Sequence, residues 1–454
     1  MFRTQKYHAI QVDRGKCIGC THCMKVCPTE AIRVKDGIAV ITGERCVDCG
    51  DCMRVCPTEA FYLLQDDLSL IGRYKYRIAL FPSVLPGQFP DHVTDDQIYG
   101  ALLKIGFTHL FEVEQPIQWM VEAYRNYHAT HGNSTPLISA FCPAIVRLIQ
   151  IRYPSLIDKI MLINAPHDLA AHFAIESLKG QGINPEDTGI FYIAPCSAKI
   201  AAVKDPVGEK KSVVDGIINM HEIYNKVMSI VTDDPGVAEG GFREHLTREG
   251  ILWSLPRGEA RLFKRKSMAI DGIFNVVKML EQMETGEIPE IGFLELRACD
   301  QGCAGGIMVA GNRFLTVERL DRRSRKFPHA ANHPPELPFK ADVLSRLVLD
   351  PIEPAHAFQL GKDRQTAMEK MAGINKLVKK LPALDCGACG APNCHALAED
   401  IVRGNAALTD CIFLRFKNEN QDGNTGHSTL HSLEKIWGAG RFSTQIKTDE
   451  HESF

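Results

Sequence analysis

A cysteine-rich stretch of sixteen residues occurs twice near the start of the chain, and this duplication constrains the fold more than any other feature. The first copy, CIGCTHCMKVCPTEAI, begins at Cys17, and the second, CVDCGDCMRVCPTEAF, begins at Cys46, which is 29 residues later (46 − 17). Each copy has the spacing C-x2-C-x2-C-x3-C-P. A tight loop with this spacing presents three sulfurs and its backbone amides to one side of a bound group. We therefore expect this part of the chain to fold around metal.

The spacing is typical of a pair of 4Fe–4S cubes, in which three close thiolates hold one cube and the fourth cysteine reaches the other. One predicted ligand set is Cys17, Cys20, Cys23 and Cys56, and the other is Cys46, Cys49, Cys52 and Cys27. A zinc module is the alternative, but eight cysteines in this duplicated order rarely form one. Residues 8–62 resemble the bacterial two-cluster ferredoxins, which implies electron transfer. Between the two copies, Asp36-Gly37 predicts the turn of a hairpin.

Composition limits the class of protein and its partners. The 454 residues exceed one ordinary domain, and 45% hydrophobic with 24% charged residues is typical of a globular protein. The net charge of −3 gives no support for nucleic acid or an anionic membrane as a partner. No run of about eighteen apolar residues predicts a membrane span, and the first residues lack the apolar core of a signal peptide. We therefore expect a cytoplasmic protein, in which the sixteen cysteines serve metal or redox chemistry.

From about Tyr76 onward, short apolar runs alternate with amphipathic segments, which predicts a multi-domain α/β protein with mostly parallel sheets. The expected strands are RIALFPSV, THLFEV, LISAF, KIMLIN, IFYIAPC and GFLELRAC. We expect a ferredoxin-like α+β domain with two 4Fe–4S clusters over residues 1–66, an α/β domain over 67–350, a linker helix over 351–380, a small helical cluster module over 381–417 and a polar tail over 418–454.

A second cysteine group lies near the end of the chain. It consists of Cys386, Cys389, Cys394 and Cys411, with the spacing C-x2-C-x4-C-x16-C. Glycines and a proline between these cysteines allow a close wrap, which suggests another 4Fe–4S cluster, with structural zinc as the alternative. The group resembles the small cluster module of some corrinoid iron–sulfur proteins and electron-transport complex subunits.

Four cysteines remain after these two groups, in the contexts SAFCPAI, IAPCSAK and LRACDQGCAGG. They are Cys142, Cys196, Cys299 and Cys303. Taken singly, each would be read as a buried structural thiol. Because two of them follow strand-like runs, and the ends of parallel strands gather around ligand sites, the count of four favours a further cluster.

The three contexts resemble the signature motifs of the iron-only (diiron) hydrogenases, in the same order and with comparable spacing, over about residues 1–320. The resemblance implies that the four remaining cysteines hold the cube of an H-cluster within the domain over 67–350. Cys303 would also bridge to a diiron subcluster with CO and CN ligands. Lys199 matches the lysine that bonds one cyanide, and Pro82-Ser83 match the stretch that contacts the other.

The chain departs from these motifs where protons are transferred. In active members, a cysteine before the first ligand passes protons to the diiron centre, whereas here that residue is Phe141, whose ring has no exchangeable proton. Methionines near the cluster are replaced by Ala194 and Arg297. These changes resemble the sensory branch of the family. Glu295 aligns with a family glutamate, and either joins an alternative proton route or is a salt-bridged or surface carboxylate.

The resemblance therefore predicts a ferredoxin-type iron-only hydrogenase of low activity, which oxidises H2 or reduces protons slowly and acts as an H2 or redox sensor. H2 and protons would be its substrates, a redox carrier such as ferredoxin or a signalling partner would exchange electrons, and hydrogenase maturation proteins would supply the diiron unit. The alternative is an electron-transfer or scaffold protein with four 4Fe–4S clusters and no diiron subcluster. A fast hydrogenase with another proton relay is a third hypothesis, against which Phe141 counts.

Overall fold

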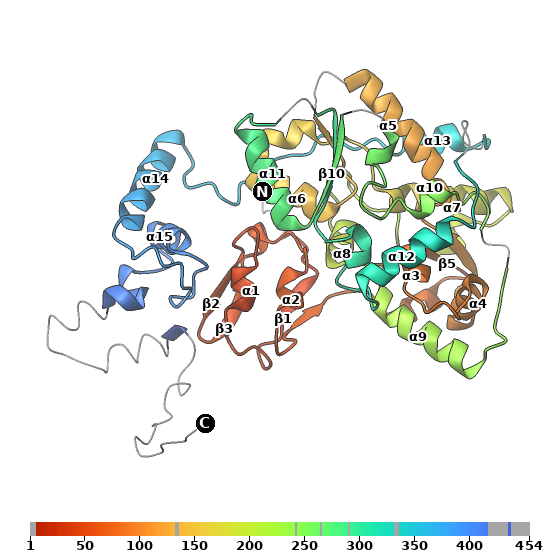
Figure 1. Cartoon of the computed structure of the whole chain (residues 1–454), viewed down its shortest axis with the longest axis horizontal. Coiled ribbons are helices and arrows are strands. Elements are labelled where there is room, and N and C mark those ends of the chain that lie inside the picture. Colours follow the sequence, from red (N-terminus) through yellow and green to blue (C-terminus); the bar gives the residue numbers. More distant parts are fainter. Residues whose placement is uncertain are drawn as a thin grey trace, which may run out of the picture. The chain divides into compact units, whose positions relative to one another are not determined.

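The computed structural model describes residues 6–131, 136–240, 243–263, 266–288, 291–330, 336–415 and 435–436 (Figure 1). The chain forms two compact units, each assembled from separate segments of the sequence. The first comprises Met1–Ala9, Val47–Gly50 and Leu63–Ala355, and the second comprises Ile10–Cys46, Asp51–Tyr62 and His356–Phe454. The expected polar tail lies outside the described residues, except for residues 435–436.

The first unit contains a four-stranded parallel sheet with the strand order β6–β5–β8–β9. The strands are β5 (Tyr76–Phe81), β6 (His109–Glu112), β8 (Thr188–Ala194) and β9 (Gly216–Asn219). β8 is buried along its whole length, as is usual for an inner strand of a parallel sheet that helices cover. The helices against this sheet are α4 (Asp95–Ile105), α7 (Pro166–Gly180), α8 (Ser197–Lys204) and α9 (Met220–Asp233). The predicted α/β fold is confirmed.

A second parallel sheet in the same unit has the strand order β10–β11–β7. Its strands are β7 (Leu137–Ile138), β10 (Ser267–Asp271) and β11 (Phe293–Arg297), and the nearby helices are α5 (Ile117–His131), α6 (Pro143–Arg152) and α11 (Ile273–Glu284). The strand expected at KIMLIN is wrong. Pro154 begins a 3-10 helix that runs to Lys159, and only two isolated bridges follow among the described residues, from Ile160 to Ile138 and from Ile163 to Val348.

Two apolar clusters form the core of the first unit, one around each sheet. Four further helices complete the unit: α3 (Val84–Gly87), α10 (Arg248–Ile251), α12 (Arg313–Ser324) and α13 (Lys340–Ser345). Cys303 packs against both clusters, whereas Phe141 belongs to the cluster beside β7 and β11 and Cys142 packs against that cluster. The fold thus places the cysteines of the central region at the junction of the two sheets.

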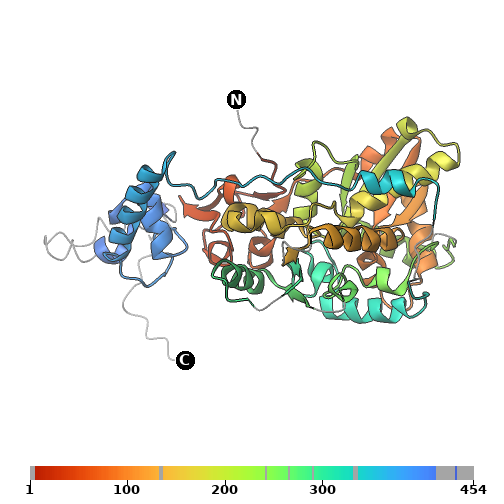
Figure 2. The ribbon, with the colours of Figure 1, turned by 90° about the horizontal axis from the view of Figure 1, so that it is seen from above.

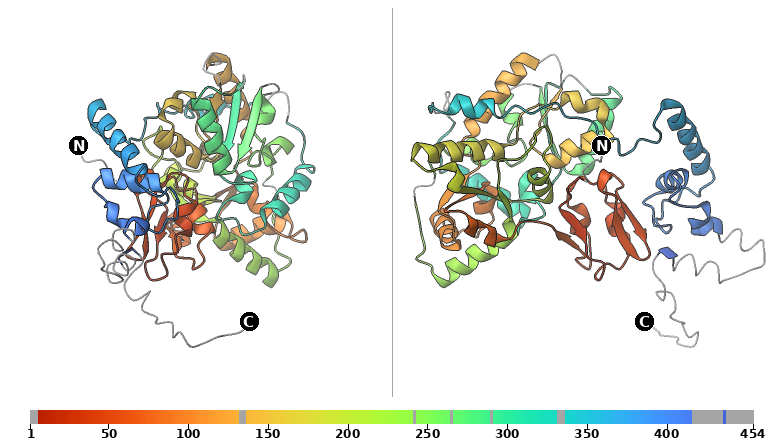
Figure 3. Two further views of the ribbon diagram at one scale, coloured as in Figure 1. Left: turned by 60° about the vertical axis from the view of Figure 1, so that its left-hand side comes forward. Right: turned by 180° about the vertical axis from the view of Figure 1, so that it is seen from behind.

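The second unit is built around a short hairpin and two one-turn helices, the red segment of Figure 3. The hairpin strands β2 (Ile32–Lys35) and β3 (Ile38–Ile41) are antiparallel, and both turn residues have positive φ, 51° at Asp36 and 75° at Gly37. This confirms the predicted hairpin, since such turns need residues that tolerate positive φ. The other elements are β1 (Ile10–Val12), α1 (His22–Lys25), α2 (Asp51–Arg54) and β4 (Phe61–Leu63), which pairs with β1.

The C-terminal part of the second unit packs against this hairpin region. Its helices α14 (Arg364–Val378) and α15 (Cys394–Val402) lie side by side (Figure 2). A buried ion pair joins Arg45 to Glu399 on α15, and Arg33 Nε donates to Asp400 Oδ2 at 2.6 Å. Charges taken out of water are tolerated only when they are paired in this way, so these contacts fix the orientation of α15 against β2 and the turn before α2.

The longest described helices, α5, α7 and α14, have 15 residues each. A membrane crossing requires about 20 mostly apolar residues. Within the described ranges, no helix combines that length with that apolar character.

Candidate metal centre

The four cysteines of the central region lie at the ends of strands or the starts of helices. Cys142 precedes α6, Cys196 lies between β8 and α8, Cys299 follows β11, and Cys303 lies in the 3-10 helix Gly302–Gly305. The thiols of Cys142, Cys196 and Cys303 interact electrostatically with one another. Cys299 lies on the same turn as Cys303, because Gly302 N donates to Cys299 O at 3.2 Å. The structure therefore brings the predicted ligands together.

The protonation of these thiols is governed by burial. Burial raises the pKa of Cys196 to about 12, with Lys199 opposing the rise and Cys303 and Cys142 adding to it. Burial also raises the pKa of Cys303, against the opposing charges of Lys199 and Arg297. Thiols in this state bind metal only by releasing their protons. A set of soft sulfur donors in a buried site with cations beside it suits an anionic iron–sulfur cube.

Phe141 is held between two cationic side chains. The guanidinium carbon of Arg297 lies 3.4 Å from the centre of the Phe141 ring, and Lys199 Nζ lies 4.5 Å from the same point. Lys199 also lies 5.7 Å from the centre of the Tyr192 ring. Cations bind the faces of aromatic rings more strongly when water is excluded. The Phe141 ring therefore fills the space beside the two side chains and stabilises their charges.

Arg297 is held by two buried carboxylates. Its Nη2 lies 2.8 Å from Glu259 Oε2, and its Nε lies 3.4 Å from Glu295 Oε1. Glu295 also accepts hydrogen bonds from the backbone N–H groups of Arg257, Glu259 and Ala260, at 3.0, 2.9 and 2.8 Å. Although burial lowers the pKa of Arg297, the two carboxylates raise it above its ordinary value. These contacts favour the salt-bridged interpretation of Glu295 over a proton route.

Pro82 and Ser83 lie between β5 and α3, where a chain of hydrogen bonds begins. Ser83 N donates to Glu114 Oε2 at 2.8 Å, and Ser254 Oγ donates to Glu114 Oε1 at 3.1 Å. The carbonyl of Ser254 in turn accepts from Cys303 N at 2.9 Å. Burial raises the pKa of Glu114 to about 7, and the neighbouring carboxylate of Glu112 adds to the rise. Ser83 is therefore linked to the cysteine loop through a buried carboxyl group.

One of the two predicted N-terminal ligand sets, Cys17, Cys20, Cys23 and Cys56, lies together in the structure. Cys23 interacts electrostatically with Cys20, Cys17 and Cys56, and these four residues line one small pocket. Cys52 interacts in the same way with Cys27. Backbone N–H groups donate to sulfur at Cys17, Cys27 and Cys56, at 3.3, 3.2 and 3.2 Å. Such bonds stabilise thiolate and are usual around iron–sulfur clusters.

The C-terminal cysteines also lie together in the second unit. Cys389 interacts electrostatically with Cys386 and Cys411, and Cys394 is the first residue of α15. Gly387 and Gly390 both have φ of 79°, which lets the loop wrap as its glycines predict. Three of the four predicted ligands of this third group, Cys386, Cys389 and Cys411, therefore lie close to one another.

Three regions of the chain match known protein families. Residues 79–240 match the family model of the iron only hydrogenase large subunit, C-terminal domain. Residues 9–61 match the 4Fe-4S dicluster domain, and residues 381–413 match a putative Fe-S cluster family. The periplasmic Fe hydrogenase large subunit of Nitratidesulfovibrio vulgaris is 31% identical over 217 residues, which are 43% of this chain and 51% of that protein. Residues 79–240 of this chain are therefore similar to the C-terminal domain of the iron only hydrogenase large subunit.

Other relatives of this hydrogenase-like chain match shorter segments. An uncharacterized protein of Methanocaldococcus jannaschii is 43% identical over 51 residues, 11% of this chain and 23% of that protein. One component of the ion-translocating oxidoreductase complex of Rhodobacter capsulatus is 47% identical over 38 residues, 8% of this chain and 20% of that component. The chain thus spans between a fifth and a half of the length of these relatives. A variant of the FeFe-hydrogenase of Chlamydomonas reinhardtii superposes with a TM-score of 0.48 at 15% identity, over 63% of this chain and 98% of that one.

Sequence reasoning did not identify three polar residues near the site, which are Glu114, Glu259 and His167. Glu114 follows a strand within the run FEVEQ, where alternating acidic residues usually indicate a solvated edge. Glu259 lies 38 residues before its partner Arg297 in the sequence (297 − 259), so no local pattern joins them. His167 was one of seventeen histidines without a metal-binding pattern, yet it is buried beside Tyr192. The only signal for Glu114 was its position two residues after the end of β6.

Proposed function

We propose that the first unit binds an H-cluster, with a cube on Cys142, Cys196, Cys299 and Cys303 and a diiron subcluster attached through Cys303. When bound, such a centre supplies the heterolytic cleavage and formation of H2. The proposal is supported by the convergence of three of the thiols with Lys199, and by the hydrogen-bonded link from Ser83 to Cys303. Lys199 and Ser83 would hold the cyanide ligands, and a buried cation suits that task.

We infer that turnover is slow, and the observation that carries this inference is the position of Phe141. The ring stands where a proton donor is expected, with Arg297 and Lys199 against it. Phe141 has no proton to give, and an arginine paired with two carboxylates does not release one at neutral pH. Glu295 is then a positioning residue that fixes Arg297 against the ring.

Slow turnover suits a sensor, in which the redox state of the clusters reports H2. Electrons would pass through the clusters of the second unit to a redox carrier or a signalling partner. The buried Arg45–Glu399 pair supports this, because it holds the C-terminal cluster module against the ferredoxin-like region within that unit. Maturation proteins would be needed to insert the diiron unit.

Counting iron in the matured protein separates this proposal from the alternative. Four 4Fe–4S clusters contain about sixteen irons, whereas a diiron subcluster raises the total to about eighteen. We expect about eighteen irons per chain after maturation and about sixteen without it. A total that stays near sixteen in both preparations would favour the electron-transfer or scaffold protein.

Replacing Phe141 with cysteine tests the slow-turnover inference. Phe141→Cys is expected to raise the rate of H2/D2 exchange at least about tenfold, because a positioned acid contributes at least that much. The matched control is Phe141→Ala, which opens the same space without a thiol and is expected to leave the rate near that of the wild type. Because Arg297 lies against the ring, it would favour the thiolate and limit the gain at alkaline pH. Equal rates in all three proteins would show that this position does not limit turnover.

A further inference from the structure

The first unit contains a pocket of about 60 Å³ next to the loop that carries Cys142. Pro143, which follows that cysteine at the start of α6, is one of its lining residues. Most of the wall is apolar, and among the side chains that form it are Val146, Ile163, Val207, Leu349 and Ile352. Because a water molecule occupies about 30 Å³ of liquid, this space takes a ligand of only a few non-hydrogen atoms.

Backbone hydrogen bonds hold the segments of this wall together. Asp350 N donates to Gly208 O at 2.7 Å, which ties the loop around Val207 to a segment far along the chain. Asn164 N donates to Leu347 O at 2.8 Å, which fixes the opposite part of the wall to the same segment. The pocket is therefore built into the fold.

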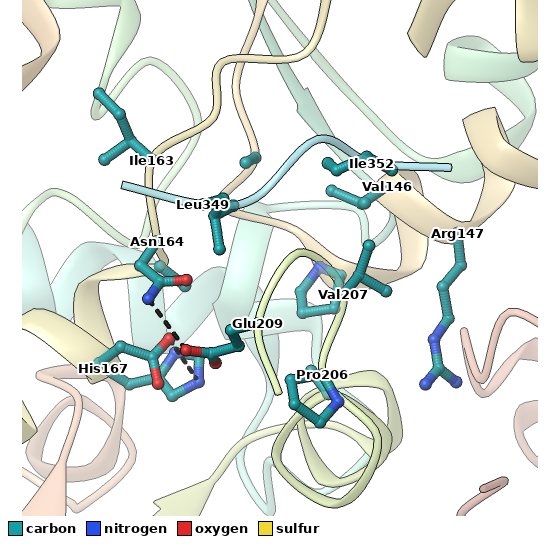
Figure 4. Close-up of a pocket in the computed structure, with 15 residues that line it drawn as sticks. Val146, Arg147, Ile163, Asn164, His167, Pro206, Val207, Glu209, Leu349 and Ile352 are labelled. Atoms are coloured by element: carbon teal, nitrogen blue, oxygen red, sulfur yellow. Dashed lines mark hydrogen bonds and ion pairs between the residues drawn. The ribbon is translucent and has the colours of Figure 1, made fainter. Parts of the chain in front are cut away.

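One end of the pocket is polar, and Figure 4 shows Asn164, His167 and Glu209 gathered there. Asp168, which follows His167 in the first turn of α7, also lines the pocket. Asn164 Nδ2 donates to Glu209 Oε2 at 3.2 Å, and His167 Nε2 lies 3.5 Å from Asp168 Oδ2. Two carboxyl groups, an amide and an imidazole therefore share this end.

The imidazole of His167 has an unused hydrogen-bonding atom. His167 is only 3% exposed, and its Nδ1 is buried with no hydrogen-bond partner among the described residues. Burial lowers the pKa of His167 well below its ordinary value, and Lys199 lowers it further, so the ring is neutral and one of its nitrogens accepts hydrogen bonds. A buried polar atom without a protein partner normally contacts water or a ligand.

The carboxyl groups of the polar end have no cation of their own in the pocket. Arg147 is the only lysine or arginine among the described lining residues, and its Nη1 is paired with Asp48 at 3.0 Å. Burial raises the pKa of Glu209, and it raises that of Asp168 to about 8, with Glu209 adding to the second rise and Lys199 opposing it. A cation bound at this end would offset the cost of burying the two carboxylates.

We propose that this pocket binds a small primary alkylammonium ion, whose charged group enters the polar end and whose alkyl chain lies against the apolar wall. An ammonium group has three N–H donors. Glu209, Asp168 and Nδ1 of His167 offer three acceptors, since Nε2 of the same ring faces Asp168 and carries the ring hydrogen. Glu209 is partly exposed, so the polar end is accessible from solvent. Binding requires no diiron unit, and the inference therefore stands apart from the proposed function.

Isothermal titration calorimetry of the full-length protein with propylammonium chloride tests the site. We expect one saturable site per chain with a dissociation constant of about 0.1–10 mM, because so small a ligand makes few contacts. At matched ionic strength, 1-propanol should bind at least about tenfold more weakly, since hydrogen bonds to charged groups are the stronger ones. Sodium propionate should give no saturable heat. Absence of saturable heat with propylammonium, or equal affinity for propanol or propionate, overturns the proposal.

Substitutions at two partly exposed positions locate the binding. Glu209→Gln keeps the shape of the side chain but removes its charge, and should weaken propylammonium binding at least about tenfold. Val207→Phe should fill the apolar part and abolish binding, because Val207 lines the pocket. The matched control is Glu222→Gln on α9, which removes a carboxylate outside the pocket and should leave the affinity unchanged. Wild-type affinity in Glu209→Gln or Val207→Phe, or an equal loss in Glu222→Gln, overturns the proposal.

Asp168 should give the binding a signature in released protons. At about pH 7 its carboxyl group holds a proton, and an ammonium group beside it favours the ionised form, so its O–H bond breaks and the proton passes to the buffer. Across the range from about pH 7 to about pH 9, Lys199 and Arg147 stay charged and His167 stays neutral, which leaves Asp168 and Glu209 as the possible sources.

The measured heat should therefore depend on the ionisation enthalpy of the buffer at about pH 7 and not at about pH 9, where Asp168 is already ionised. Asp168→Asn should remove most of this dependence, whereas Glu222→Gln should keep it. Wild-type binding without proton release at about pH 7, or release that is unchanged in Asp168→Asn, overturns the placement of the ammonium group beside Asp168.

Discussion

Replacing Cys303 with serine is expected to abolish H2/D2 exchange and to remove the diiron unit from the matured protein. Cys303 is partly buried and packs against both apolar clusters of the first unit, and its backbone N–H donates to the carbonyl of Ser254. Serine has nearly the same size, but its hydroxyl is a poor substitute for a thiolate toward iron. Iron counting should show a loss of about two irons if only the diiron unit is lost, and about six if the cube is lost as well.

The matched control is Cys386→Ser in the C-terminal group. It should lower the iron content by at most about four and leave the diiron unit in place, because Cys386 belongs to the second unit. Protein with Cys303→Ser that keeps the full iron content and exchanges H2 would show that Cys303 is not the attachment point.

Replacing Arg297 with methionine is expected to lower the free energy of unfolding by about 3–5 kcal/mol. The substitution leaves Glu259 and Glu295 buried with no cation beside them, since both carboxylates are completely shielded from water. Chemical denaturation followed by tryptophan fluorescence measures the loss. Trp119 and Trp253 are buried in the first unit, and Trp253 O accepts a hydrogen bond from Arg297 at 3.3 Å.

Arg297→Lys separates charge from geometry. Lysine keeps the positive charge but not the planar fork that reaches both carboxylates, so a smaller loss of stability is expected. A methionine variant as stable as the wild type would show that Glu259 and Glu295 become protonated without loss of stability. The two carboxylates would then not account for the position of Arg297 against the Phe141 ring.

The features that sequence reasoning recovered are those with local signals. The cysteine spacing of the N-terminal repeat predicted that Cys17, Cys20, Cys23 and Cys56 meet, and the turn at Asp36-Gly37 predicted the hairpin, because both have a recognisable pattern in the sequence. Apolar runs predicted β5, β6, β8 and β11 for the same reason. KIMLIN has the same apolar character, but a 3-10 helix that begins at Pro154 runs into its first residue, and the stretch forms only isolated bridges at Ile160 and Ile163.

The polar contacts around the site had no such signal. Arg297 was recognised as a departure from the family motif, but its position on the Phe141 ring and its pairing with Glu259 depend on how two sheets meet. His167 and Asp168 are ordinary residues for the first turn of a surface helix, and only their burial beside Tyr192 and Glu209 distinguishes them. Buried charge is a property of the packed fold, which a single sequence does not encode locally.

Infrared spectroscopy of the matured full-length protein tests the central claim most directly. Carbon monoxide and cyanide bound to iron absorb where protein groups do not, so their bands report the diiron subcluster alone. The account predicts carbonyl and cyanide bands that shift when H2 is added, and their loss in Cys303→Ser. Protein that has passed through the maturation machinery, carries its 4Fe–4S clusters and shows no such bands would contradict it.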